Sequence, residues 1–286
     1  MSRTPELVDM AFIGDRLVDT ARSLGVHPRL MATAMIPMIE EQFPLTRQIE
    51  CTACVMGHKQ SAFLGLAKRL GIRRIILEKS GDPSLDPSTI AQVLEEKDFE
   101  VGVADFSQGT LEGIKSTARG LDSAAKGEKL AGKYEEELGR AWDILPANLN
   151  KRILVLLGLN LPGNPDDLLL VEEPGMTVDG TILSPCGCTN VGSAIKKAGG
   201  PTDDQPMRLI ETLDGLEGAA PDMIALTGNP SPGLLAIHEY ILRHPKAGEI
   251  PAIANQAIFS LPHCCEAEPM ALPRTLLRWS RALESV

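Results

Sequence analysis

Short apolar runs alternate with amphipathic stretches along most of the chain, and this alternation predicts strands followed by helices. Strands that alternate with helices in this way are typical of a parallel sheet. The expected strands are Arg73–Leu77, Phe99–Val103, Ile153–Leu157, Met223–Leu226 and Ala257–Ser260. Two further strand-like runs are expected at Arg47–Glu50 and Gly180–Ser184. The pattern predicts an α/β fold.

Helices are expected between these runs. Gln60–Leu70 is closed by Gly71, a residue type that suits a helix C-terminus. In the segment Asp86–Glu96, Asp86 can cap the helix and the following proline suits its first turn. A third helix is expected at Val191–Ala198, before two glycines.

The middle of the chain predicts one long helix at Ser123–Leu145, which Pro146 ends. Its apolar residues recur every three or four positions and form one stripe: Leu130, Tyr134, Leu138, Trp142 and Leu145. We expect an N-terminal α/β lobe at 1–120, a connector helix at 121–147 and a C-terminal α/β lobe at 148–286. The alternative is an ordinary crossover helix within a single sheet.

The composition argues against several classes of function. The 286 residues include 28 Lys+Arg and 38 Asp+Glu, a net charge of -10, which argues against nucleic-acid binding and against a polybasic membrane contact. Aromatic residues make up 3% of the chain, too few for stacking platforms that bind sugars or single strands. No apolar run approaches the ~18–20 residues of a membrane span. The opening segment Met1–Met10 lacks the pattern of a signal peptide, so a cytoplasmic location is expected, or a periplasmic one if a signal was removed.

The six cysteines are the strongest chemical signal because they form three close pairs. The pairs are Cys51 with Cys54, Cys186 with Cys188, and Cys264 with Cys265. Thiolates are soft ligands that suit iron–sulfur clusters, zinc and Cu(I). His263 precedes the third pair and is a candidate ligand or hydrogen-bond donor to it. The alternatives are a redox or disulfide use, either as a Cys51–Cys54 loop or as a strained ring between the two vicinal cysteines, and inert packing.

Several motifs, in this order, resemble the metal-chelate substrate-binding proteins of ABC transporters, which capture siderophores, haem and vitamin B12. They cover most of the chain from Arg47 onward: Arg47–Leu77, Leu121–Leu138, Ala194–Gly200, Leu213–Leu226 with its Pro-Asp pair, and His244–Ser260. The resemblance implies two three-layer, Rossmann-like lobes joined by one long helix, with ligand held between them. About 46 residues precede the first matching strand, and this long preceding segment departs from the family pattern.

Combining the resemblance with the cysteines places each pair on a loop at the carboxyl end of a strand, where open parallel sheets bind ligands. We therefore expect a binding protein that holds an iron–sulfur or other thiolate-bound metallocluster, of a type that the sequence does not specify, for storage, delivery or assembly. Its partner would be a metalloprotein client or a transporter.

Two alternative functions remain. One is an ABC-transporter receptor for a metal chelate or corrinoid, and the other is a small iron–sulfur reductase. Phosphate-loop, zinc-protease and nucleophile-elbow motifs are absent from the sequence, so a binding role is favoured over an enzymatic one.

Overall fold

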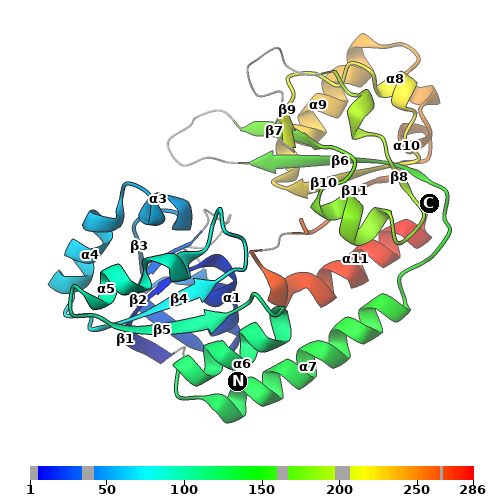
Figure 1. Ribbon diagram of the computed structural model, residues 1–286. Helices are drawn as coiled ribbons and strands as arrows, with labels where there is room; N and C mark the ends of the chain where they lie inside the picture. Colours follow the sequence, from blue (N-terminus) through cyan, green and yellow to red (C-terminus); the bar gives the residue numbers. More distant parts are fainter. Residues whose placement is uncertain (1–5, 34–41, 160–166, 197–206, 265–266) are drawn as a thin grey trace. The chain divides into compact units, whose positions relative to one another are not determined.

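The computed structural model describes residues 6–33, 42–159, 167–196, 207–264 and 267–286 (Figure 1). The chain divides into two compact units. Unit 1 comprises residues 1–139 and 266–271, and unit 2 comprises residues 140–265 and 272–286. The division falls inside the long helix α7 (Ala124–Asp143). The connector role assigned to residues 121–147 stays a prediction.

Unit 1 contains a five-stranded sheet, sheet A, in which every neighbouring pair of strands is parallel. The strand order is β3-β2-β1-β4-β5. The strands are β1 (Glu6–Ile13), β2 (Val26–Ala32), β3 (Arg47–Gln48), β4 (Arg74–Lys79) and β5 (Glu100–Asp105). Parallel neighbours require crossover connections, and the connections from β1 to β2, from β3 to β4 and from β4 to β5 contain helices.

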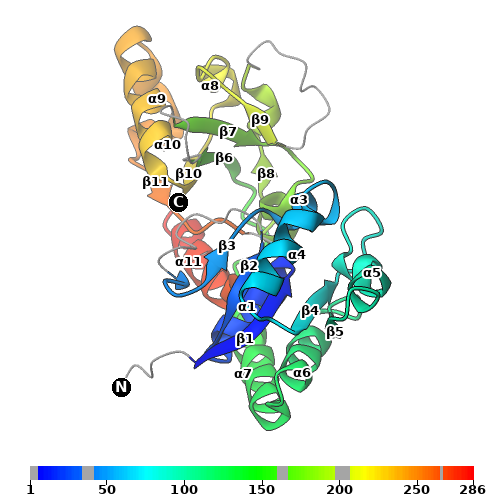
Figure 2. The same cartoon turned by 90° about the vertical axis from the view of Figure 1, so that its left-hand side faces the viewer.

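Helices cover both faces of sheet A (Figures 1 and 2). They are α1 (Asp15–Ser23), α3 (Thr52–Met56), α4 (Gln60–Arg69), η1 (Pro87–Ile90), α5 (Ala91–Glu95), α6 (Thr110–Gly120) and, near the chain end, η5 (Pro269–Ala271). Successive strand residues point to opposite faces, so β4 sends Ile75 and Leu77 into one apolar core and Ile76 into the other. Unit 1 therefore has three layers.

Unit 2 is built on sheet B, with the order β11-β10-β6-β7-β9 and β8 beside β6. The strands are β6 (Arg152–Leu159), β7 (Leu168–Glu172), β8 (Thr189–Asn190), β9 (Met207–Leu209), β10 (Met223–Gly228) and β11 (Ile258–Ser260). β6, β10 and β11 are parallel, whereas β7 runs antiparallel to both of its neighbours. The sheet is therefore mixed, a refinement of the predicted parallel arrangement.

The remaining elements of unit 2 are η2 (Asp179–Leu183), η3 (Gly192–Ala194), α8 (Leu216–Ala219), α9 (Pro230–Arg243), η4 (Ala247–Glu249), α10 (Pro251–Ala254) and α11 (Leu272–Glu284). Leu154 and Ile224 face a core shared with α9 and α10. Ile153 and Met223 point the other way and are also completely buried. Sheet B is thus covered on both faces, and the predicted α/β class with Rossmann-like lobes is confirmed in each unit.

The five main predicted strands are confirmed as β4, β5, β6, β10 and β11. The predicted helix 60–70 is α4, and the Asp86 carboxylate accepts the Ser88 N–H at 2.9 Å as the expected cap. The first strand of the lobe was expected only after about 46 residues, and this was wrong. The segment before Arg47 contains β1 and β2, and β1 is the central strand of sheet A. Pro28 lies within β2, where it pairs with Val8 of β1.

Three local predictions were also wrong. Gly180–Ser184 is not a strand but lies on a π-helical turn. The buried Glu172 carboxylate holds the start of this turn, because it accepts the backbone N–H groups of Val178 (2.6 Å) and Asp179 (3.2 Å). The described part of 191–198 forms only the short 3₁₀ turn η3, and residues 197–206 lie outside the described residues. In α7, Tyr134 is buried as predicted, but Trp142 is 38% exposed.

Among the described residues, no helix combines the length and the apolar character that crossing a membrane requires.

Candidate functional site

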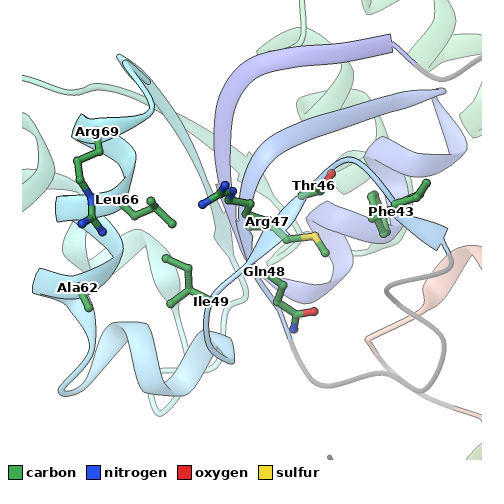
Figure 3. A pocket seen from close by; sticks show the side chains of 10 residues that line it. Phe43, Thr46, Arg47, Gln48, Ile49, Ala62, Leu66 and Arg69 are labelled. Atoms are coloured by element: carbon green, nitrogen blue, oxygen red, sulfur yellow. The ribbon is translucent and has the colours of Figure 1, made fainter.

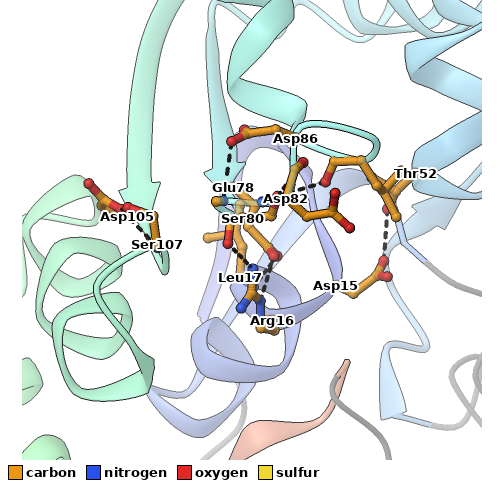
Figure 4. A network of polar contacts seen from close by, with 12 residues as sticks. Asp15, Arg16, Leu17, Thr52, Glu78, Ser80, Asp82, Asp86, Asp105 and Ser107 are labelled. Carbon is orange, nitrogen blue, oxygen red and sulfur yellow. Dashed lines mark hydrogen bonds and ion pairs between the residues drawn. The ribbon is translucent and has the colours of Figure 1, made fainter.

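The carboxyl end of sheet A gathers polar side chains from four loops (Figure 4). Asp15 follows β1, Thr52 follows β3, Ser80 follows β4 and Ser107 follows β5. Parallel strands open their carboxyl ends at one edge of a sheet, and ligands of open α/β sheets bind there. This edge is the candidate ligand-binding surface of unit 1.

Glu78, near the end of β4, holds the segment that follows β1. Its carboxylate accepts hydrogen bonds from Arg16 Nε at 2.7 Å and from the Leu17 N–H at 3.1 Å. Arg16 also donates to the Ser80 carbonyl at 3.1 Å. Glu78 is 5% exposed, and burial raises the pKa of its carboxyl while the Arg16 charge opposes that rise. Gly14 is required beside it: φ is +140°, and an added Cβ would lie 2.2 Å from Glu78 Cβ.

A second set of contacts joins the ends of β1, β2 and β3. The Thr52 hydroxyl lies 2.7 Å from Asp15 Oδ1 and 3.3 Å from the Ala32 carbonyl oxygen, so it can donate to either. Thr52 is buried, and these contacts hold the start of α3 in place. Figure 4 shows the Asp15–Thr52 contact beside the Glu78 group.

The loop after β4 is held by its own side chains. Asp82 accepts the Ser84 N–H at 2.9 Å, and Asp86 accepts the N–H groups of Ser88 at 2.9 Å and Gly81 at 3.3 Å. Hydrogen bonds from Ser84, first from its backbone N–H, lower the pKa of Asp82, which therefore stays ionised at neutral pH. The loop presents fixed carboxylates at the edge of the sheet.

Asp15, Arg16 and Glu78 were not among the site residues predicted from the sequence. A signal was present, because the apolar run that ends at Ile13 is followed by Gly-Asp-Arg, a strand–turn–helix pattern. It was missed because β1 itself was not recognised.

The first cysteine pair lies at this same edge, as predicted. Cys51 precedes α3, and its Sγ accepts a hydrogen bond from the Cys54 N–H at 3.3 Å. The two Sγ atoms are 2.8 Å apart, and both residues are partly exposed. The hydrogen bond with the Cys51 side chain, together with smaller contributions, raises the pKa of the Cys54 thiol.

The second pair lies at the opposite end of its sheet, so its predicted position was wrong. Cys188 directly precedes β8, whose Thr189 pairs with Arg152, the first residue of β6. Cys186 and Cys188 are therefore at the amino end of sheet B, and both are buried. Burial raises the pKa of the Cys186 thiol to about 12 and also raises that of Cys188. Neither thiol is poised to ionise at neutral pH.

The third pair follows β11 at the carboxyl end of sheet B. Cys264 is buried, and Cys265 lies outside the described residues. The neighbouring Pro262 carbonyl accepts the Trp279 Nε1–H at 2.9 Å, which ties this segment to α11. His263 Nδ1 is buried and makes no hydrogen bond within the described residues, and burial lowers the pKa of the imidazole. His263 is therefore neutral at pH 7.

The cysteines of unit 2 are not brought together. Through β10, Ser260 at the end of β11 lies level with Leu156 of β6. Thr189, next to Cys188, lies level with Arg152 of β6. The two levels are four strand residues apart, or about 13 Å. Two thiolates on one zinc ion lie only about 4 Å apart. Within the described part of the chain, no group of three His, Cys, Asp or Glu side chains is placed to hold a metal ion.

A cavity of about 670 Å³ lies beside the edge strand of sheet A (Figure 3). Its walls come from β3, from the segment before β3, and from α4. Figure 3 shows Arg47 extending from β3 toward α4, with Ile49 and Leu66 lining the space between them. Neither Glu78 nor a cysteine lines this cavity, so it is separate from the polar edge described above.

The whole chain can be superposed on solved substrate-binding proteins. The apo haem-binding protein RhuT from Roseiflexus sp. RS-1 matches with a TM-score of 0.60 and 16% identity over 98% of both chains. An ABC transporter substrate-binding protein from Listeria monocytogenes EGD-e matches with a TM-score of 0.52 and 14% identity over 98% of both chains. The chain has the substrate-binding-protein fold of ABC transporters.

The vitamin B12-binding protein BtuF of Vibrio cholerae has the same fold, with a TM-score of 0.57 and 11% identity over 98% of both chains. No family model and no curated protein sequence matches the chain. At identities of 11–16%, the likeness establishes the substrate-binding-protein fold and not the ligand. The predicted resemblance is thereby confirmed at the level of the fold.

Proposed function

We propose that the chain is a receptor that captures a metal chelate, such as haem or a corrinoid, for an ABC transporter. The single observation that carries this proposal is the likeness over 98% of the chain to proteins named for binding haem and vitamin B12. RhuT and BtuF are named as periplasmic. A periplasmic location therefore accompanies the proposal, in place of the cytoplasmic one expected from the sequence.

The carboxyl edge of unit 1 supports this function. Its loops are fixed by the Glu78–Arg16 and Asp15–Thr52 contacts, so a ligand would meet side chains that are already ordered. Pre-ordered polar groups reduce the entropic cost of binding. The hydroxyls and carboxylates suit the amide, hydroxyl and metal-bound water groups at the rim of a chelate.

His263 is the residue that we propose contacts the metal of the cargo. It follows β11 at the carboxyl end of sheet B, and its Nδ1 is buried without a hydrogen-bond partner among the described residues. Its pKa is lowered, so the neutral imidazole that binds iron or cobalt is present at pH 7. His263 was among the predicted metal ligands, and here it is proposed to bind the metal of a chelate instead of a cluster.

The iron–sulfur holder has less support. The solved proteins reported above are not named as iron–sulfur proteins, and the register separates Cys188 from the strand that leads to Cys264. The register argues against one centre that uses both Cys188 and Cys264, whereas a metal-binding role stays a prediction for Cys51, Cys54, Cys186, Cys188, Cys264, Cys265 and His263.

The test is a titration of the full chain with haemin, hydroxocobalamin and ferrioxamine, followed by absorbance and by tryptophan fluorescence. We expect saturable one-to-one binding of one of these classes. His263→Ala should weaken that binding at least about tenfold, or about 1.4 kcal/mol. The matched control is His238→Ala on the exposed face of α9, which should bind like the wild type.

Two results would contradict the proposal. One is the absence of saturable binding to all three probes by a folded protein. The other is a brown protein from anaerobic purification with stoichiometric iron and acid-labile sulfide, which would favour the cluster hypothesis. Wild-type affinity in His263→Ala would remove only the role of His263.

A further inference from the structure

We propose that Cys51 and Cys54 form a reversible dithiol–disulfide site that exchanges with low-molecular-weight disulfides such as oxidised glutathione. The inference concerns unit 1 alone and holds whatever ligand the protein carries.

The geometry of the pair is close to that of the oxidised form. The two Sγ atoms lie 2.8 Å apart, and a disulfide needs about 2.05 Å, so closure requires a movement of less than about 1 Å. The loop is held in position because the buried Thr52, between the two cysteines, contacts Asp15 and the Ala32 carbonyl through its hydroxyl. Closing the bond therefore leaves the surrounding fold unchanged.

The surroundings of the pair permit exchange. Both cysteines are partly exposed, so a small disulfide can reach them. The Cys54 N–H donates to Cys51 Sγ at 3.3 Å, which holds this sulfur beside Cys54 Sγ. The loop closed by the bond is very short, so the bond adds little stability and is easily reduced again. Among the described residues, no third metal ligand completes a site around the pair.

The exchange balances in two steps. The Cys51 thiolate attacks one sulfur of oxidised glutathione, forms a mixed disulfide and releases one glutathione thiolate. The Cys54 thiolate then attacks Cys51 Sγ, forms the Cys51–Cys54 bond and releases the second glutathione. The protein loses two S–H bonds and two electrons, and the glutathione disulfide gains both.

Cys186 and Cys188 provide an internal control. They have similar spacing in the sequence, but both are buried at the amino end of sheet B. We expect them to stay reduced under conditions in which Cys51 and Cys54 are oxidised.

The experiment equilibrates the full chain in a series of reduced and oxidised glutathione buffers. Each sample is quenched with acid, unfolded and alkylated, and its peptides are read by mass spectrometry. The Cys51–Cys54 peptide should lose both alkyl groups as the buffer becomes oxidising, with a single midpoint, and regain them on reduction. The Cys186–Cys188 peptide should carry both alkyl groups throughout.

Two variants separate the steps. In Cys54→Ser the mixed disulfide at Cys51 has no resolving thiol, so the peptide should retain one glutathione. In Cys186→Ser the midpoint of the Cys51–Cys54 pair should be unchanged. Full alkylation of Cys51 and Cys54 at every buffer ratio would overturn the proposal, as would a Cys54→Ser protein that is folded by circular dichroism yet retains no glutathione.

Discussion

Cys51 and Cys54 are partly exposed whereas Cys186 and Cys188 are buried, although the two cysteines of each pair are closely spaced in the sequence. The first pair is partly exposed at the carboxyl edge of sheet A. The second is buried at the amino end of sheet B. Spacing alone therefore does not determine the chemistry of a cysteine pair, because the surrounding fold decides whether the thiols meet solvent.

Two buried glutamates repeat this contrast between the units. Glu78 in unit 1 is paired with Arg16, at 2.7 Å. Glu172 in unit 2 is completely buried and accepts only backbone N–H groups through Oε1, while its Oε2 has no partner among the described residues. Burial raises the pKa of Glu172 to about 7. The two buried carboxyl groups therefore differ in their partners, because Glu78 has a cation beside it whereas Glu172 accepts backbone N–H groups.

The largest expected difference is in thiol reactivity. The pKa of Cys186 is raised from 9.0 to about 12, so near pH 8 its thiolate fraction is about a thousandfold below that of an unperturbed thiol. Iodoacetamide should modify Cys51 and Cys54 in the native protein, and Cys186 and Cys188 only after unfolding. Peptide mass spectrometry over time measures both rates. Equal rates for the two pairs would contradict the comparison.

The next effect is a pH dependence of stability due to Glu172. Between pH 4.5 and about 7 the carboxyl ionises in the unfolded chain but stays protonated in the fold, so the free energy of unfolding falls as pH rises. The fall should approach about 3 kcal/mol. Glu172→Gln keeps the accepting oxygen and should remove this part of the slope. Urea unfolding at pH 5 and pH 8 checks it, with Glu284→Gln on the exposed end of α11 as control.

Cys186→Ser should have a smaller effect, lowering the free energy of unfolding by about 2 kcal/mol. The cause is a hydroxyl placed in a fully buried site that was occupied by a thiol. Cys51→Ser, at a partly exposed site, should change it by no more than about 0.5 kcal/mol. Urea unfolding under reducing conditions compares the two. A larger loss for Cys51→Ser would reverse the assignment of exposed and buried pairs.

The smallest effect tests whether Arg16 accounts for the difference between the glutamates. Arg16→Met removes the cation and leaves the Leu17 N–H as the remaining donor to Glu78 among the described residues, an environment closer to that of Glu172. The variant should be about 1 kcal/mol less stable at pH 8 than the wild type, and the loss should shrink at pH 5, where the carboxyl is more often protonated. A loss that does not depend on pH would mean that Arg16 acts through packing on Phe106, whose ring centroid lies 5.1 Å from the guanidinium carbon.

The predicted fold was mostly right where burial alone determines the pattern. Ile153–Leu157 and Met223–Leu226 are continuous apolar runs because both faces of their strands are covered. β1 and β2 were missed because β1 starts with partly exposed residues and β2 contains Pro28. Their place in sheet A depends on pairing with segments far away in the sequence, which local patterns do not reveal.

The candidate site was less predictable. The position of Cys51 and Cys54 followed correctly from the strand before them. The error at Cys186 arose because Thr181–Ser184 has the composition of a strand, while the buried Glu172 fixes the start of a helical turn there. That contact joins two separate segments, and composition does not encode it.

The assignment of residues 266–271 to unit 1 has a consequence for synthesis of the protein on the ribosome. The Met270 N–H donates to Asp19 Oδ2 at 2.9 Å, across 251 positions of the chain. Unit 1 therefore lacks one of its own segments until residues 266–271 have been translated, although most of its residues emerge before unit 2. Contacts of such long range slow folding. Asp19 and the end of α1 would wait, incompletely covered, while unit 2 is still being made, and a truncation before residue 266 would leave both units unfinished.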